Sequence, residues 1–156
     1  MITMETKNLE IKREVFKTLL ELKKKQYDRI KVYQREQLNS INDADLDRSE
    51  ILESQTENMM REMRTESSSL DHLKAEIDYL EDYNSFGARE VVGPSTIVKT
   101  NSANYVVAVP ENIFKVGSDW YHGISTQSPI YKALLGKSKG DKISFNGQEI
   151  IVMMVV

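Results

Sequence analysis

The 156-residue sequence contains no cysteine, and its only metal-binding nitrogens belong to two histidines. This excludes disulfide bonds, thiolate zinc sites and a cysteine nucleophile, and it argues against a protein-only zinc site. No apolar run approaches the roughly 20 residues that a membrane-spanning helix needs. The first 20 residues are interrupted by charges, which is not typical of a signal peptide. We therefore expect a cytoplasmic protein without membrane contact.

Strong net charge is also absent. Lys and Arg total 21 and Asp and Glu total 24, which gives a net charge of −3. This balance argues against stable DNA binding by the protein alone. No glycine-rich phosphate loop is present, so we expect no cofactor of its own. The charge is unevenly placed, because residues 5–38 carry 10 basic and 6 acidic residues and residues 43–82 carry 4 and 13.

Glycine and proline are missing from the first 86 residues, since all seven glycines and all three prolines lie at or beyond Gly87. These residues cost about 1 and about 3 kcal/mol in a helix interior, so their absence permits long helices. The segment Asn84–Gly87 indicates a helix end. We predict two domains, 1–86 and 87–156.

Residues 1–86 carry the pattern of an antiparallel two-helix coiled coil. Apolar residues of the second arm recur at steps of four and three, with one polar interruption at Glu66: Leu52, Thr56, Met59, Met63, Leu70, Leu73, Ile77 and Leu80. The first arm has a looser stripe, interrupted by Gln26 and Gln37, of Val15, Leu19, Leu22, Ile30 and Tyr33. The short polar connection at residues 39–47 makes the arms antiparallel neighbours.

Residues 87–156 carry the pattern of a small α+β domain. Two β-branched runs, 95–100 and 105–109, predict a hairpin. Ser128 and Pro129 are typical of a helix start, and Gly136 of its end. The dipeptide at 146–147 predicts a type I′ turn into a central strand at 150–156. We expect Trp120 and Tyr121 in the core, with a partner-contact patch as the alternative.

The predicted tip of the hairpin is acidic. It places four carboxylates within eight residues: Asp43, Asp45, Asp47 and Glu50. One interpretation is helix capping, with Asp47 or Ser49 at the start of the second arm. The other is a divalent-cation site, because hard cations prefer carboxylate oxygens. The glycine and glutamate of a calcium-binding EF-hand loop are replaced by Arg48 and Ser54, so an EF-hand is excluded.

The C-terminal part resembles a known family. The segment Gly123–Ile130, the run Ala133–Lys137 and the Gly140–Asp141 pair are similar to the C-terminal domain of the Gre transcript-cleavage factors, GreA and GreB. The order of parts also fits, because these factors have an N-terminal antiparallel coiled coil followed by a small FKBP-like domain. The resemblance is dense over roughly 20 residues and weak in the coiled coil.

This resemblance implies a partner, bacterial RNA polymerase. The C-terminal domain would dock at the rim of the secondary channel, with contacts from Gln127, Ser128, Pro129 and Ile130. The coiled coil would carry the tip acids Asp43, Asp45, Asp47 and Glu50 to the active site. Three of them, Asp45, Asp47 and Glu50, would share a magnesium ion held by the polymerase, close to the RNA 3′ end. The chain would be an accessory factor and not an enzyme.

The tip departs from the family's Asp-Leu-x-Glu-Asn-type motif. When Asp45 and Leu46 are laid on the motif, its glutamate falls on Arg48. A shift by two residues restores the spacing with Asp47 and Glu50 but loses the leucine. Stimulation of RNA cleavage and inhibition of the polymerase therefore both remain open. Two further alternatives are an adaptor coiled coil and a prolyl isomerase.

Overall fold

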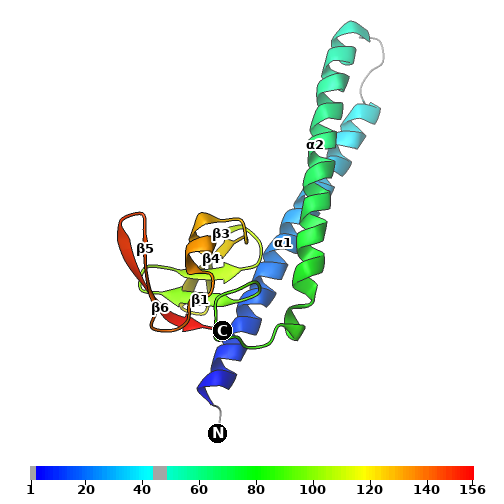
Figure 1. The fold of residues 1–156 in the computed structure, drawn as a ribbon. Helices are drawn as coiled ribbons and strands as arrows, with labels where there is room; N and C mark the ends of the chain where they lie inside the picture. The colour runs from blue at the N-terminus through cyan, green and yellow to red at the C-terminus, as the bar shows by residue number, and fades with distance from the viewer. Residues whose placement is uncertain (1–2, 44–48) are drawn as a thin grey trace. The chain divides into compact units, whose positions relative to one another are not determined.

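The computed structural model describes residues 3–43 and 49–156, and the side chains of residues 40–54 lie outside this description. Two long helices, α1 (Met4–Asp43) and α2 (Ser49–Glu81), precede a short 3-10 helix, η1 (Tyr83–Ser85). A six-stranded sheet with one short helix follows (Figure 1). The chain is thus of the predicted α+β class. None of the described helices is long and apolar enough to cross a membrane.

Two side-chain contacts fix the direction of α1 against α2. Lys23 on α1 lies 3.1 Å from Glu76 on α2, and Gln37 donates a 3.4 Å hydrogen bond to Glu62. The contact that lies later in α1, at Gln37, lies earlier in α2, at Glu62, and the two contacts are separated by the same number of residues in both helices. The two helices are antiparallel, as the sequence predicts.

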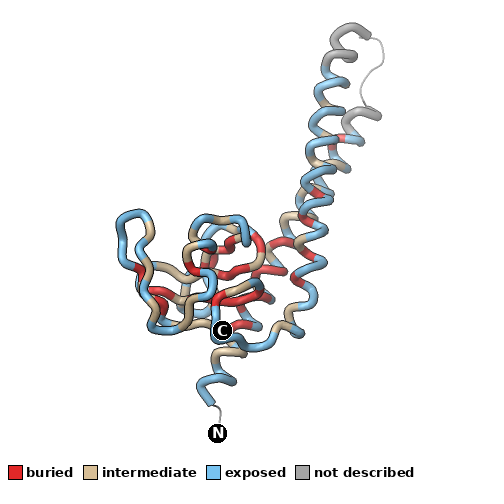
Figure 2. The backbone as a smooth tube through the Cα atoms, viewed as in Figure 1, coloured by how far each residue is buried: buried red, intermediate tan, exposed pale blue. Residues whose placement is uncertain are grey.

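Burial along α2 follows the predicted heptad positions. Leu70, Leu73, Ile77 and Leu80 are buried, while Thr56, Met59, Met63 and Glu66 are half-buried (Figure 2). The first arm agrees less well with its predicted stripe. Gln37, a predicted polar interruption of the stripe, is buried, but Tyr33 is 50 % exposed. The placement of Tyr33 in the seam was therefore wrong. Gln34, at the neighbouring position, is half-buried.

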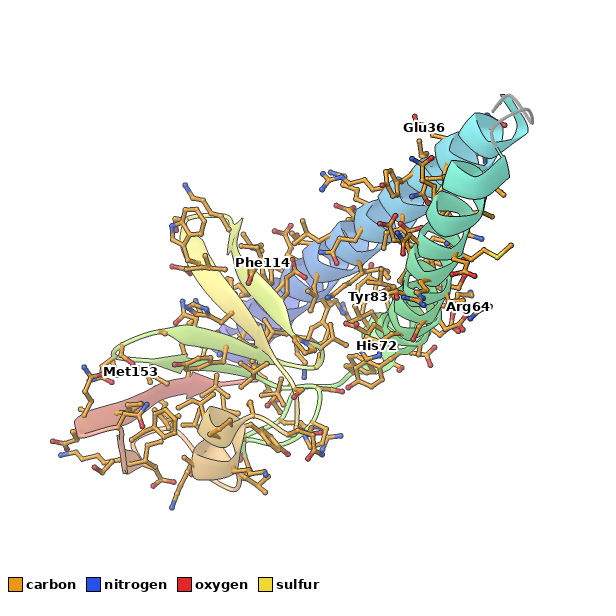
Figure 3. The ribbon with its side chains drawn as sticks, turned by 90° about the horizontal axis from the view of Figure 1, so that it is seen from above. Glu36, Arg64, His72, Tyr83, Phe114 and Met153 are labelled. Carbon is orange, nitrogen blue, oxygen red and sulfur yellow. The ribbon has the colours of Figure 1, made fainter. Side chains whose placement is uncertain are left out.

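The strands of the sheet are ordered β3-β4-β2-β1-β6-β5. The predicted first hairpin is confirmed, because β1 (Ile97–Thr100) pairs antiparallel with β2 (Asn104–Val107). The predicted second hairpin is also present, formed by β5 (Lys142–Phe145) and β6 (Gln148–Val155). β6 lies between β1 and β5, so it is an inner strand as expected. Its Met153 is nevertheless 54 % exposed (Figure 3).

The turn residues adopt the conformations that their types favour. Asn146 and Gly147, between β5 and β6, both have positive φ, as a type I′ turn requires. Ser128 caps α3 (Pro129–Leu134) by accepting a 3.3 Å hydrogen bond from the backbone N–H of Tyr131. Gly136, with φ of +80°, follows this helix. The predicted helix start and end are confirmed.

Two strands were not predicted, β3 (Glu111–Val116) and β4 (Asp119–Ile124). They pair antiparallel with each other, and β4 also pairs parallel with β2. Adjacent side chains of β4 point to opposite faces of the sheet. Tyr121 is therefore buried at 1 % exposure, while Trp120 is 51 % exposed. The expectation of a core position is confirmed for Tyr121 and wrong for Trp120.

One face of the sheet packs against α3. The core on this face contains two residues of α3, Tyr131 and Leu134. The other buried residues of this core are Val92 and the strand residues Val98, Val107, Ile124 and Val152. Partly buried residues extend this core, among them Tyr105, Ile130 and Ile143. The helix begins directly after the Ser125–Ser128 turn, so the core fixes the position of that turn.

Spatial contacts divide the chain into two compact units. The sheet unit comprises Met1–Leu20 and Leu80–Val156, and the helix-pair unit comprises Glu21–Tyr79. These limits differ from the domains 1–86 and 87–156, which follow composition and stay a prediction. The sheet unit thus includes the first part of α1, and each unit is described by itself below.

Candidate functional site

The four predicted tip acids fall at the edge of the described structure. Asp43 is the last residue of α1 and Glu50 is the second residue of α2. Asp45 and Asp47 lie outside the described residues, as do the side chains of Asp43 and Glu50. Among the side chains that the structure does describe, no group of three or more acidic or histidine residues could hold a metal ion. The tip site stays a prediction.

The predicted docking segment begins at a capped helix. The hydroxyl of Ser128 accepts from the Tyr131 N–H and donates to the carbonyl of Ser125 at 2.9 Å. Ser128 is thus engaged in building the helix start. Gln127 is exposed, and its backbone N–H donates to the Ser125 hydroxyl at 3.2 Å. This turn presents the Gln127 side chain and Pro129 to the surface.

A largely apolar groove of about 680 Å³ lies beside this segment. Pro129 and Ile130 form one wall, and Glu111, Asn112 and Ile113 of β3 also line it. The remaining lining residues come from β2, β4 and β5, and they are Tyr105, His122, Gly123, Ile124 and Phe145. The structure therefore brings two of the four predicted docking residues into one surface hollow.

The groove has aromatic rings on its floor. The rings of Tyr105 and His122 lie 5.9 Å apart between centroids, on residues that are register partners in β2 and β4. Burial raises the pKa of the Tyr105 hydroxyl, so it stays protonated near neutral pH. An apolar floor with few polar groups is suited to binding side chains of another protein.

Gly123 permits a close approach of strands below the groove. A Cβ built on Gly123 would lie 2.5 Å from the carbonyl oxygen of Val109 and 2.7 Å from the backbone nitrogen of Glu111. Both neighbours are backbone atoms and cannot rotate away. The glycine of the Gre-like segment thus allows β3 to lie against β4 at the groove.

The base of α1 carries a buried amine in the sheet unit. Lys12 is 1 % exposed and donates a 2.8 Å hydrogen bond to the carbonyl of Gly87. Burial, with a smaller contribution from Arg89, lowers the pKa of Lys12 to about 8. Nearby, the rings of Phe16 and Phe86 meet edge to face at 5.2 Å. These contacts hold residues 86–87 against the helix.

The helix-pair unit contains a buried ion pair. The ammonium of Lys23 lies 3.1 Å from Glu76, and the two side chains are 6 % and 10 % exposed. The exposed His72, one turn before Glu76, lies 3.2 Å from the other carboxylate oxygen (Figure 3). Removal of one partner of such a pair costs more than the pair contributes. The pair fixes the register of the helices more than it stabilises them.

Sequence reasoning missed the part of the groove that β3 and β4 supply. A usable signal was present: Gly117 and Ser118 form a two-residue turn, with positive φ at Gly117, between two runs that contain aromatic and β-branched residues. Recognition of this hairpin would have placed Ile113 and His122 near one another. It would also have predicted opposite faces for Trp120 and Tyr121.

No protein-family model and no curated protein matches the chain. Several solved structures do match the chain. A GreA factor homologue, Gfh1, from Thermus thermophilus is 22 % identical with a TM-score of 0.36, covering 92 % of this chain and 94 % of that one. Gfh1 of Thermus aquaticus is 20 % identical with a TM-score of 0.38, covering 94 % of each chain.

A third structure, described as the transcription factor Gfh1, is 23 % identical with a TM-score of 0.35 and covers 87 % of this chain and 92 % of that one. Identity below 25 % and a TM-score below 0.5 do not transfer a function from one protein to another. The chain is similar to these Gre-related structures over most of its length. Its function has to be argued from its own residues.

Proposed function

We propose that this protein is a Gre-like accessory factor that binds bacterial RNA polymerase and acts through its secondary channel. The observation that carries the proposal is the groove beside α3. Its wall is made by Pro129 and Ile130, which belong to the segment that resembles the Gre factors. The residues that carry the resemblance therefore line a surface suited to a protein partner.

The helix pair supports the part of the proposal that concerns action through the secondary channel. Within the helix-pair unit, α1 runs over residues 21–43 and α2 over 49–79, which at about 1.5 Å per residue gives roughly 35 and 45 Å. The pair is antiparallel, so the end of α1 and the start of α2 lie at the same end of the pair, and the tip acids occupy the sequence between and beside these two helix ends. Such an arrangement suits delivery of carboxylates into a narrow channel.

The chemistry at the far end would be metal-assisted hydrolysis by the polymerase itself. Asp45, Asp47 and Glu50, with Asp43 beside them, would help hold a magnesium ion that the polymerase supplies. A carboxylate donated in this way fixes a weakly held cation, and the cation lowers the pKa of its bound water. The backtracked RNA 3′ end would then be cut, with no cofactor bound by this protein alone.

The docking half is tested at an exposed position of the segment. Gln127→Glu places a charge next to the groove without touching the Ser128 cap, so the fold should stay intact. We expect weaker binding to core RNA polymerase in a competition assay. Lys139→Glu, at an exposed residue in another turn, is the matched control. Equal affinity of Gln127→Glu and wild type would contradict the docking proposal.

The tip half is tested in a stalled elongation complex with labelled RNA. The triple variant Asp45→Ala, Asp47→Ala, Glu50→Ala should bind the polymerase and lose its effect on the RNA. Full activity of this variant would remove the tip from the proposal.

One sequence feature favours a second role, inhibition of the polymerase without cleavage. Arg48 stands among the tip acids, where it would place a positive charge beside the metal. The same labelled-RNA assay separates the two roles, because cleavage shortens the RNA and inhibition slows its extension. An adaptor role without polymerase binding is excluded if wild type binds.

A further inference from the structure

Trp120 is a prominent side chain that the proposed docking groove does not use. It is the only tryptophan in the sequence, and it is 51 % exposed on β4. Ile113, on the neighbouring strand β3, is 52 % exposed. Single exposed apolar residues are common on protein surfaces, but clustered ones mark interaction sites. These two residues line the same hollow.

This hollow measures about 290 Å³ and lies between the β1–β2 turn and the β3–β4 hairpin. Its lining includes Ser102, Asn104, Ser118 and Asp119. It shares Ile113 and His122 with the docking groove. The two hollows therefore meet at these two side chains and form one continuous surface.

Strand geometry places the relevant side chains on one face. Trp120 and His122 are two residues apart on β4, so they point to the same side of the sheet. His122 pairs in register with Tyr105, whose ring lies on the groove floor. Lys115 of β3 is the register partner of Trp120. Tyr105, His122, Trp120 and Lys115 thus follow one another across the face.

The charge of Lys115 is not matched by an acid among the described residues. Its ammonium lies 5.8 Å from the centroid of the Trp120 ring. By contrast, Lys99 is paired with Asp119 at 2.9 Å, and Lys142 lies 3.7 Å from Glu149. The surface around Trp120 therefore presents an aromatic ring next to a lysine that forms no ion pair among the described residues, while Asp119 of the same hollow is paired with Lys99.

We propose that Trp120 and Lys115 extend the docking groove, beyond Ile113, into a second contact with the polymerase. The partner segment would place an apolar side chain against Trp120 and a carboxylate near Lys115. Tryptophan is enriched among the residues that dominate binding energy, and an opposite charge at the rim accelerates association. This inference rests on the proposed function, because it takes the same protein as partner.

The test is binding of the full chain to core RNA polymerase. Trp120→Ala should weaken the affinity about tenfold or more, as loss of an interface anchor does. Met153→Ala, which removes an equally exposed apolar side chain from β6, should stay within about twofold, as near-neutral positions do. Lys115→Glu should weaken binding several-fold at low salt and less at high salt, whereas Lys139→Glu should not.

Failure of this inference is distinct from failure of the proposed function. If wild type does not bind the polymerase, both are overturned. If wild type binds and Trp120→Ala binds equally well, only the second contact is overturned. Self-association of wild type that Trp120→Ala abolishes, seen by light scattering, would assign the surface to a second copy instead. Should Trp120→Ala not fold, Lys115→Glu decides the outcome.

Discussion

The sheet unit and the helix-pair unit are held together in different ways. Among the residues with described side chains, the helix-pair unit contains three buried apolar residues, Leu70, Leu73 and Ile77. The other buried apolar residues belong to the sheet unit. Polar side chains are buried in both units, Lys23 and Gln37 in the helix-pair unit and Lys12, Ser95, Thr96 and Thr100 in the sheet unit. The units therefore differ in their apolar packing, which is extensive in the sheet unit and confined to a narrow seam in the helix pair.

This difference suits the roles that we propose for the two units. A well-packed unit holds the groove residues in fixed positions, as a docking surface needs. A helix pair with few buried apolar residues gains little stability from its seam. Three buried side-chain oxygens there, on Gln37, Glu66 and Glu76, accept no hydrogen bond among the described residues, although the Glu76 oxygen lies 3.1 Å from the Lys23 ammonium. The helix pair therefore suits presentation of its tip better than formation of a core.

The largest loss of stability should come from breaking the Lys23–Glu76 ion pair in the helix-pair unit. Glu76→Gln leaves the Lys23 ammonium buried without its carboxylate, and we expect a loss of about 3 kcal/mol in helix-pair stability. The double variant Lys23→Leu, Glu76→Leu should be as stable as wild type or more so. Urea unfolding followed by far-UV circular dichroism measures both.

The exposed pair Lys74–Asp78, at 61 % and 57 % side-chain exposure, supplies the control. Lys74→Gln should change stability by less than about 0.5 kcal/mol. If Glu76→Gln behaved like Lys74→Gln, polar pairing would not specify the helix pair.

The next largest loss of stability should come from disturbing the packing of the sheet unit. Gly123→Ala forces a Cβ against the backbone of Val109 and Glu111, so we expect a loss of about 2 kcal/mol. Fluorescence of Trp120 during urea unfolding reports this loss in the sheet unit. Gly93→Ala is the control, because its Cβ meets nothing within 4 Å. Wild-type stability of Gly123→Ala would refute close packing at the groove.

A smaller effect is expected at the β5–β6 turn. Gly147 has φ of +78°, a conformation that side chains with a Cβ rarely adopt. Gly147→Ala should therefore lower stability by about 1 kcal/mol. Thermal unfolding followed by circular dichroism measures the shift, and an unchanged midpoint would mean that the turn relaxes without cost.

A further effect is a pH dependence of stability at Lys12. Its pKa is about 8 in the folded protein against 10.5 for the free side chain. Between these pH values the unfolded chain binds more protons, so the free energy of unfolding rises with pH. Lys12→Met should lack this rise. Urea unfolding of both proteins at pH 7.5 and pH 10 measures the difference, and parallel pH profiles would contradict the burial of a charged amine.

Much of the sheet unit was predictable because its turns carry local signals. Ser128 with Pro129, Gly136, and the pair Asn146–Gly147 each dictate a backbone conformation that the structure adopts. The β3–β4 hairpin was missed because its runs mix polar and apolar residues. The parallel pairing of β2 with β4 joins residues distant in sequence, and no local pattern encodes it.

The candidate site was predictable only in part. A resemblance in sequence pointed to Pro129 and Ile130, and the structure places both on a groove wall. The opposite wall and the floor come from β2, β3 and β4, so the groove exists only once the chain has folded. Heptad spacing predicted the seam of α2 correctly. In α1 it placed both Tyr33 and Gln37 in the seam, and Gln37 is buried, but Tyr33 is exposed and its neighbour Gln34 is half-buried.

One measurement tests the central claim directly: a backtracked elongation complex with end-labelled RNA, scored for bound protein and for RNA length together. Wild type should bind and alter the RNA. The tip triple variant Asp45→Ala, Asp47→Ala, Glu50→Ala should bind equally and have no effect on the RNA. The groove variant Asn112→Glu with Gln127→Glu should lose binding and effect together. A wild-type protein that does not bind the complex, or a tip variant that retains the full effect, would contradict the account.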